Sequence, residues 1–591
     1  MKKNQPLAFY KEQQQLFEKE LKKIKQKLFQ LSMVRLVVFL AIVFCTWFFF
    51  GNIKVIIPVL IIGIALFFYL VTIYSDLKLL KQKTQQLIQI NQVELHVLKG
   101  DLSDLELGNQ FKDPSHFYSY DIDLFGNGSF FQYINRTTIH TGKEKLASIL
   151  SENTIDDIVK KQEAITELSE MPKWRQHFSA TGSLIMVDES IETIVNWLKN
   201  HTFFTPKFMN YLPTVFGGIS LILFVLSYFS FIPNSLIVLW FFVGLTVTGI
   251  YIKKINALYL YANKAKDTFK QYHQLLAFIE NETFTSEILL QNQSAIKTET
   301  QKASQIFLKL SKILDAFDQR NNMIIGIFVN AFALRDLQHC YNIEQWIKTY
   351  AEKVDSWFEV IAFFDAQNSL ANFSFNHPNF TFPAVLENQT TLKAEDLGHP
   401  LIKEEKRVTS SVTINTEEFF IITGANMAGK STFLRTISLS IVMSNIGLPI
   451  CANKFEYSPI KLITSMRTSD SLTEDESYFF SELKRLKYIV DNIATDNYFI
   501  ILDEILKGTN STDKAIGSKK FVQKLVGSNS TGIIATHDLS LCKISEELPE
   551  VKNYFFDAEI INDELHFDYT LKTGICKNMN ASFLLKKMEI V

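Results

Sequence analysis

Four long uncharged apolar runs stand out in the hydrophobic pattern of the chain. They form two pairs, residues 36–50 with 55–74 and residues 211–229 with 236–252, and a short loop joins the members of each pair. A membrane-spanning helix needs about 20 apolar residues. Buried core helices are the alternative interpretation, but the tight pairing favours two transmembrane helical hairpins over residues 34–74 and 206–252.

Lysines flank these runs unevenly. Residues 1–33 carry eight lysines and more follow the second and fourth runs, whereas the two hairpin loops hold only Lys54. Cytosolic segments next to membrane spans are enriched in Lys and Arg. We therefore expect a charged cytosolic helix over 1–33, a cell (inner) membrane location, and the rest of the chain on the cytoplasmic side.

Helical spacing of apolar residues continues between and after the hairpins. It predicts a helical linker over 75–120, a helical core domain over 121–205 and a helical lever region over 253–378. Beyond this point apolar strands alternate with helices, which is typical of a parallel α/β domain, over 379–591. The net charge of −2 gives no global nucleic-acid signal, and five scattered cysteines predict neither a disulfide framework nor a zinc site.

A glycine-rich loop in this last region carries the strongest chemical signal. An apolar run, 419–423, leads into the pattern G-x-x-x-x-G-K-S. Backbone N–H groups in such a loop, and at the helix start after it, bind phosphate. A chance turn is the alternative, but the strand–loop–helix context disfavours it. The expected nucleotide-binding residues of the loop are Gly424, Asn426, Met427, Gly429, Lys430, Ser431 and Thr432.

Two later strand ends supply candidate catalytic groups. An apolar strand ends in Asp503 and Glu504, and another ends in His537. We expect Ser431 and Asp503 to hold Mg²⁺, Lys430 to reach the β- and γ-phosphates, and Glu504 to polarise the attacking water. His537 would sense the γ-phosphate or position water, although a lone histidine is more often structural. These residues predict a Mg²⁺-dependent ATP hydrolase.

The C-terminal motifs resemble the ATPase domain of the MutS family of DNA mismatch-repair proteins. The Asn426-Met427 pair makes the loop more similar to that family than to a generic phosphate loop. The other similar motifs are Gly398-His399-Pro400, Ser469-Asp470-Ser471-Leu472, Ser477 to Glu482, Asp503-Glu504-Ile505 with Gly508-Thr509, Ala535-Thr536-His537 and, in the core domain, Asn135-Arg136-Thr137 and Lys161-Gln162-Glu163-Ala164-Ile165.

This resemblance implies an ATP-driven homodimer with composite sites, in which Ser477 reaches the γ-phosphate bound by the other subunit. Asp475-Glu476 stand where the family has Gly-Arg, which reverses the local charge. We expect no mismatch-reading domain before the first span, and we find no convincing F-x-E wedge. The predicted fold class is multidomain α and α/β, with two transmembrane hairpins, an all-α core and lever region, and a C-terminal P-loop α/β ATPase domain.

The expected function is a membrane-anchored MutS-like ATPase that uses ATP and Mg²⁺ to drive a DNA-binding clamp, in mismatch repair or related DNA processing. A transporter-type ATPase is one alternative, disfavoured because no L-S-G-G-Q signature follows the loop. A membrane scaffold whose ATP site gates dimerisation, without action on DNA, is the other alternative.

Overall fold

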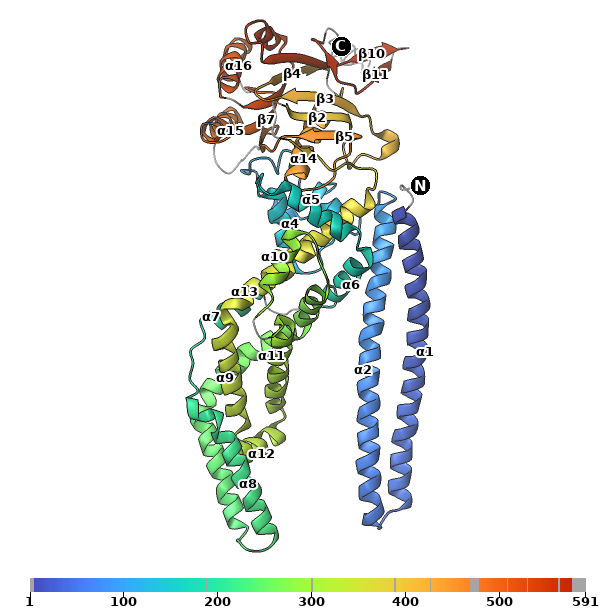
Figure 1. Ribbon diagram of the computed structural model, residues 1–591, viewed down its shortest axis with the longest axis vertical. Coiled ribbons are helices and arrows are strands. Elements are labelled where there is room, and N and C mark those ends of the chain that lie inside the picture. The colour runs from blue at the N-terminus through green and yellow to red at the C-terminus, as the bar shows by residue number, and fades with distance from the viewer. Residues whose placement is uncertain are drawn as a thin grey trace.

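The computed structural model places β-sheets at one end of the molecule, and two groups of long helices extend from that end in the same direction (Figure 1). The residues described are 5–185, 190–298, 301–386, 390–425, 427–467, 478–507, 509–528, 530–561 and 564–576. The α-helices are α1 (Gln5–Phe48), α2 (Ile53–Val97), α3 (Phe130–Ile134), α4 (His140–Ser151), α5 (Ile158–Ser169), α6 (Pro172–Gly182), α7 (Ile191–Lys199), α8 (Leu212–Tyr228), α9 (Ser235–Asn281), α10 (Glu287–Ala295), α11 (Ala303–Asp318), α12 (Met323–Ala333), α13 (Arg335–Asn376), α14 (Lys430–Asn445), α15 (Tyr478–Ile493) and α16 (Ser511–Val526). Short 3₁₀ helices are η2 (Asn109–Phe111), η3 (Lys207–Asn210), η4 (Gln319–Asn321), η5 (Glu404–Lys406) and η6 (Leu539–Glu546).

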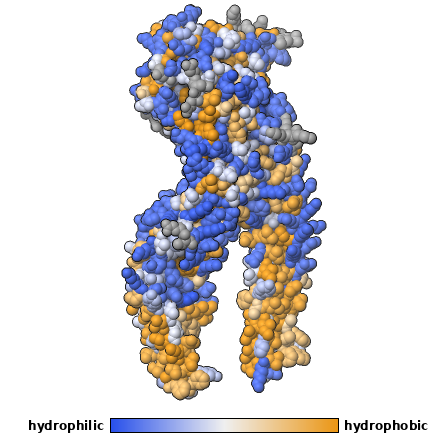
Figure 2. Space-filling view, in the orientation of Figure 1, coloured by the Kyte–Doolittle hydropathy of each residue, from blue (hydrophilic) through white to orange (hydrophobic). Residues whose placement is uncertain are grey.

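Helices α1 and α2 form the first of these groups, which we call the first leg. The predicted charged helix over 1–33 and the first apolar run are one continuous helix, α1, because no Gly or Pro lies between them. Helix α2 ends at Val97, so the predicted linker over 75–120 is α-helical only in its first half. Figure 2 shows that the apolar part of this leg lies at the end far from the sheets.

Buried groups dock the polar end of the first leg onto the rest of the molecule. Tyr10, Phe17 and Ile24 of α1 are buried at seven-residue intervals. Phe17 packs in a small cluster with two residues of α2 and Ala180 of α6. The seven-residue spacing keeps the three side chains on one face of α1, as in paired antiparallel helices.

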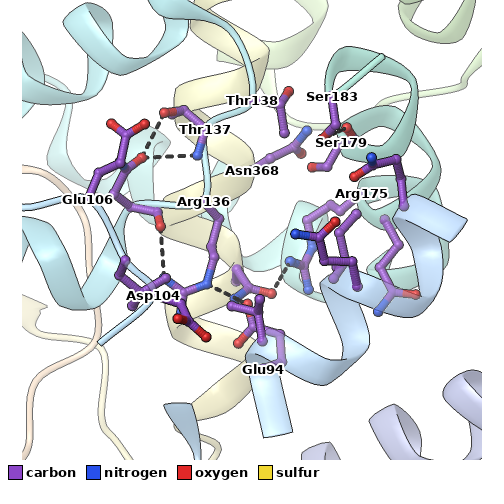
Figure 3. A pocket seen from close by; sticks show the side chains of 18 residues that line it. Glu94, Asp104, Glu106, Arg136, Thr137, Thr138, Arg175, Ser179, Ser183 and Asn368 are labelled. Carbon is purple, nitrogen blue, oxygen red and sulfur yellow. Dashed lines mark hydrogen bonds and ion pairs between the residues drawn. The ribbon is translucent and has the colours of Figure 1, made fainter. Parts of the chain in front are cut away.

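A buried carboxylate, Glu94 of α2, adds specific polar contacts to this junction. It accepts hydrogen bonds from Arg136 Nε at 2.5 Å and from Asn372 Nδ2 at 2.9 Å. Arg175 Nη1 in turn donates to Asn372 Oδ1 at 2.8 Å. Figure 3 shows these charged groups converging around a cavity of about 210 Å³ where α2, α6 and α13 meet. The buried Glu94–Arg136 pair therefore joins α2 to the segment between α3 and α4, and the Asn372 contact joins α2 to α13.

The second group of helices, the second leg, consists mainly of α8, α9, α11, α12 and α13 (Figure 1). Helix α9 runs without a break through the boundary predicted at residue 252. Its polar half packs with α11 and α13 in one core, which includes Phe269, Phe307 and Trp357. Helix α12, which the hydrophobic pattern did not predict as a separate apolar element, packs against α8 and α9. The far end of this leg is also apolar on its surface (Figure 2).

The largest sheet has six strands in the order β12-β9-β4-β8-β7-β6, parallel except for β12. A second sheet has the order β1-β5-β2-β3, and β10 pairs with β11. The strands are β1 (Ala384–Val385), β2 (Thr390–Leu397), β3 (Ser410–Asn415), β4 (Phe419–Gly424), β5 (Lys454–Tyr457), β6 (Lys461–Ser465), β7 (Tyr498–Asp503), β8 (Thr531–Ala535), β9 (Val551–Phe556), β10 (Ala558–Ile561), β11 (Glu564–Phe567) and β12 (Lys572–Thr573).

Both faces of the six-stranded sheet are covered, as a parallel sheet requires. Phe420 and Ile422 of β4 enter a core that they share with α14, with segment 118–165 and with the end of α13. The alternate residues, Phe419 and Ile421, pack in a second core with α15 and α16. The helical segment and the α/β part are therefore joined through one continuous core.

Candidate active site

The glycine-rich loop follows the central strand β4, which lies between β9 and β8. Gly429 ends the loop with a φ of +105° and caps α14. This left-handed backbone is easy for glycine and unfavourable for other residues, so the loop needs glycine here to lead into the helix. Met427 also has a positive φ and is 78% exposed. Asn426 lies outside the described residues.

Lys430, the first residue of α14, folds back over this loop. Its side chain is buried, and Nζ donates to the carbonyl oxygens of Gly424 at 2.7 Å and Ala425 at 3.0 Å. Burial lowers the pKa of the Lys430 ammonium, while nearby Asp503 and Glu504 act in the opposite direction. This arrangement places the Lys430 ammonium at the start of α14, next to the backbone of the loop.

Ser431 and Asp503 come together from two elements 72 residues apart. Ser431 Oγ donates to Asp503 Oδ2 at 2.8 Å, from the first turn of α14 to the carboxyl end of β7. A hydroxyl and a carboxylate are the hard oxygen ligands that Mg²⁺ prefers, and Mg²⁺ usually takes few protein ligands beside waters and phosphate oxygens. The pair therefore fits the predicted metal-holding role.

Glu504 is positioned by Ala535, the last residue of β8, and by His537, which follows that strand. Its backbone N donates to the Ala535 carbonyl at 2.9 Å, and its Oε1 lies 3.1 Å from Nε2 of His537. The hydrogen bond from His537, with Lys507 nearby, lowers the pKa of Glu504 to about 2 although burial opposes the shift. Glu504 has a φ of +56°, a costly conformation for this residue that is often found at functional sites.

The shared nitrogen of His537 must carry its hydrogen toward Glu504. A carboxylate only accepts, so Nε2 is the donor in that contact. The same nitrogen lies 3.3 Å from Lys430 Nζ, which is itself only a donor. The approach of Lys430 to His537 is therefore a contact without a hydrogen bond, and the hydrogen bonds of Lys430 Nζ go to the Gly424 and Ala425 carbonyls.

These side chains line one cavity of about 520 Å³ at the carboxyl ends of β4 and β7. Its lining contains Ala425, Met427, Gly429, Lys430, Ser431, Thr432, Asp503, Glu504, Lys507, His537 and Tyr569. The volume is in the range of small-molecule sites. The structure brings together the described residues predicted from the loop and the two strand ends; Gly424 contributes its carbonyl to Lys430.

Three lining residues were not predicted from the sequence: Ala425 within the loop, and Lys507 and Tyr569 outside it. Lys507 Nζ lies 3.6 Å from Glu504 Oε2. Its position three residues after Glu504 could have predicted this residue as part of the site. The Tyr569 ring is so close to the loop that a Cβ on Gly429 would lie 3.2 Å from its Cδ1. Nothing local in the sequence marks Tyr569, because the C-terminal strands bring it to the loop. Ser477 and Asp475-Glu476 lie outside the described residues, so their predicted roles stay predictions.

The core-domain motifs do not line the cavity, but Lys161 of one motif contacts the far end of α14. Lys161 Nζ donates to the carbonyl of Asn445, the last residue of that helix, at 3.2 Å. Gln162 Nε2 donates to the Pro383 carbonyl at 3.0 Å. The other motif, around Arg136, joins α3 to α4 and binds Ser369 of α13 through its backbone N. The helix that begins at the candidate site therefore ends on the helical core.

A family model described as MutS domain V matches residues 420–587. This range includes every residue that lines the cavity. A DNA mismatch repair protein MutS from Staphylococcus haemolyticus is 28% identical over 274 residues, 44% of this chain and 30% of that protein. The human MutS protein homolog 4 is 32% identical over 215 residues, 34% of this chain and 22% of that protein. The C-terminal part of the chain is therefore similar to the MutS family. The chain spans less than a third of the length of these MutS relatives, and both legs lie entirely outside residues 420–587.

Proposed function

We propose that the chain is a membrane-anchored ATPase of the MutS type, which binds ATP and Mg²⁺ in the cavity at the end of β4 and hydrolyses the γ-phosphate. The observation that carries this proposal is the convergence of Lys430, the Ser431–Asp503 pair and the Glu504–His537 pair on one cavity. The similarity of the C-terminal part to MutS domain V supports the same reaction class.

Each residue would have a distinct role. Lys430 would turn from the Gly424 and Ala425 carbonyls onto the β- and γ-phosphate oxygens, while loop N–H groups bind the phosphates. Ser431 and Asp503 would hold Mg²⁺, which when bound supplies positive charge against the phosphate oxygens. Glu504, ionised because its pKa is low, would orient and polarise the attacking water, and His537 would fix the Glu504 carboxylate.

The membrane part of the proposal rests on the two legs. Helices α1, α2 and α9 are long and apolar enough to cross a membrane, and only 6–11% of their most apolar stretches is buried. Figures 1 and 2 show the apolar ends of both legs on the same side of the molecule, far from the sheets. A single bilayer would cover both apolar surfaces, with the α/β part in the cytoplasm. Burial of such surface is the main driving force for insertion.

Two partners in the cytosol are considered for this ATPase. Similarity to the MutS proteins favours DNA, bound by a clamp that opens when ATP binds. The same similarity favours a homodimer through the α/β part, in which Ser477 acts on the ATP of the other subunit. A second candidate, a membrane scaffold gated by ATP, is favoured by one observation: the second leg ends in apolar helices rather than in a basic surface. Backbone binding to DNA depends on Lys and Arg.

The deciding experiment is the ATPase rate of the full chain in nanodiscs, with duplex, mismatched or branched DNA and with EDTA as a control. We expect Mg²⁺-dependent hydrolysis that EDTA abolishes. Stimulation by any DNA supports the clamp. Hydrolysis that no DNA changes favours the scaffold, and absence of hydrolysis together with absence of ATP binding rejects the ATPase proposal.

A further inference from the structure

A short apolar helix, α12, lies beside the two most apolar helices of the second leg. It has 11 residues, and no charged residue occurs from Asn321 to Leu334. This length is about half of what a transmembrane helix needs. Nevertheless, Ile324, Ile325 and Phe328 are 71%, 52% and 55% exposed. A water-exposed surface of this kind is costly and marks a surface that contacts an apolar partner.

The inner face of α12 packs closely on α8 and α9. A Cβ on Gly244 of α9 would lie 2.1 Å from the carbonyl oxygen of Ala331, so the two backbones are in contact at that point. Phe332 packs against Phe224 of α8 at 4.8 Å between ring centroids. Helix–helix contact through a small residue is the packing mode that is common within membranes.

These contacts fix the depth that α12 reaches. Gly244 is the midpoint of the apolar run 236–252, eight residues from each end, and Ser220 is the midpoint of 211–229. Ser220 Oγ donates to the Phe332 carbonyl at 2.7 Å. The residues before and after α12 return to the polar end of the run: Arg320 donates to Asn256 at 2.9 Å and to Asp336 at 3.0 Å.

The carboxyl end of α12 has partners that suit apolar surroundings. The last carbonyls of a helix lack intrahelical partners, and in lipid an unpaired carbonyl costs several kcal/mol. Ser220 satisfies Phe332, and Trp240 Nε1 donates to Ser220 Oγ at 2.8 Å. Asn330 donates to the Gly326 carbonyl at 2.9 Å and accepts from the Asp336 N–H at 2.8 Å. Two of the last four carbonyls of α12 are therefore paired, Phe332 with Ser220 Oγ and Asn330 with the Leu334 N–H.

We propose that α12 lies in the bilayer as a third membrane helix of the second leg, entering and leaving on the cytoplasmic side, with Ile324, Ile325 and Phe328 against lipid acyl chains. The inference rests on the proposed membrane anchoring. Only Leu334 separates α12 from α13, whose far end packs in the core beneath the six-stranded sheet through Leu370 and Phe373. A shift of α13 at the sheet would therefore move a lipid-contacting helix.

Quenching of a fluorescent label by doxyl-labelled lipid tests this proposal. The full chain carries Cys45→Ser, because Cys45 is the partly exposed thiol and the other four cysteines are buried. Phe328→Cys and Ile325→Cys report on α12. Leu221→Cys, 66% exposed on α8, is the membrane control, and Lys353→Cys on the exposed face of α13 is the aqueous control. Each protein is labelled with NBD, reconstituted in nanodiscs and checked for ATP hydrolysis.

We expect the α12 labels and the Leu221 label to be quenched at least twofold by doxyl lipid, and the Lys353 label to be unaffected. Quenching at Leu221 but at neither α12 position overturns the inference and leaves the membrane anchoring in place. Absence of quenching at all four positions overturns the anchoring as well as the inference. Because two α12 positions are used, local disturbance at one of them does not decide the result.

Discussion

Glu504 is the residue on which the proposed hydrolysis depends most directly. Replacement by Gln keeps the volume of the side chain but removes the charge that would polarise water. Glu504→Gln is therefore expected to keep ATP binding and to reduce the hydrolysis rate by about 10²-fold or more, the scale for loss of a general base. The measurement pairs a nucleotide-binding titration with single-turnover hydrolysis. Turnover at the rate of the unmodified chain in this variant would remove Glu504 from the mechanism.

Lys430→Ala is the variant to compare with Glu504→Gln, because it should affect ATP binding instead of hydrolysis alone. Lys430 would contact phosphate in the ground state as well as during hydrolysis, so its loss should weaken ATP binding itself. The same titration checks this result. Equal ATP affinity in Lys430→Ala and in the unmodified chain would mean that the loop does not hold the phosphates through this lysine.

Residues of the candidate site were predictable where they belong to continuous motifs. Asp503, Glu504 and His537 stand at or just after the end of a strand, and Lys430 and Ser431 begin the helix after the loop. Parallel strands bring their carboxyl ends together. Tyr569 was not predictable in this way, because its position depends on how the strands after β9 fold back. The contact between Glu504 and His537 was also not predictable, since it depends on strand order.

At the scale of elements, the close contact between α9 and α12 gives a sharp prediction. Gly244→Ala would force the backbone of α12 away, because the new Cβ would meet the Ala331 backbone at 2.1 Å. Overpacking of this kind costs about 1–3 kcal/mol. Gly249→Ala is the control, since a Cβ there meets nothing within 4 Å and Ala is the better helix former. Thermal unfolding in detergent should show a lower Tm for Gly244→Ala and no lower Tm for Gly249→Ala; equal Tm values would contradict the packing.

Hydrophobic patterning predicted the long helices but not their ends. The junction between charged and apolar residues in α1 changes the surroundings of the helix and not its backbone, so no break occurs there. Helix α12 was missed because 11 apolar residues are too few for a span and look like an ordinary core helix. Its exposed apolar face and its contacts with Ser220 and Gly244 distinguish it from a core helix.

At the scale of the whole molecule, the common direction of the two legs leads to a prediction of topology. The hairpin tips, near Asn52 and Asn234, should both lie outside the cell and both chain ends inside. Single cysteines at these two positions, in the Cys45→Ser background, should react with an impermeant maleimide in intact cells. Reaction of a cysteine in residues 5–20, with protection of both tips, would reverse the assignment.

The lysine distribution predicted that both hairpins enter the membrane from the same side, but not the contacts that hold the two legs in one direction. Their relative direction is set where the first leg docks, through hydrogen bonds of Glu94 with Arg136 and Asn372. Arg136 is 42 residues from Glu94 in the sequence, and Asn372 is 278 residues from it. Such long-range polar contacts leave no periodic signal in the sequence. The direction matters because one flat bilayer can cover both apolar ends only if they lie on the same side.

DNA binding by the whole molecule is expected to be weak and sensitive to salt. The net charge is −2, so affinity would come from local Lys and Arg, and that contribution falls steeply with ionic strength. Mismatch recognition usually needs a side chain that wedges between bases, and no such wedge was found in the sequence. We therefore expect little preference for mismatched over matched duplex.

The measurement is a competition titration of the full chain in nanodiscs at two salt concentrations, with empty nanodiscs as the control for lipid binding. Cytosolic segments 121–205 and 253–370 are the predicted DNA contacts. In the second leg, however, the residues farthest from the sheets are apolar and would lie in the bilayer, so only the polar halves of α9, α11 and α13 remain available to DNA. A preference for mismatched duplex that persists at high salt would reveal a reading element elsewhere in the chain. Absence of binding at both concentrations, with hydrolysis intact, would favour the scaffold and make the bilayer the target of the ATP-driven movement.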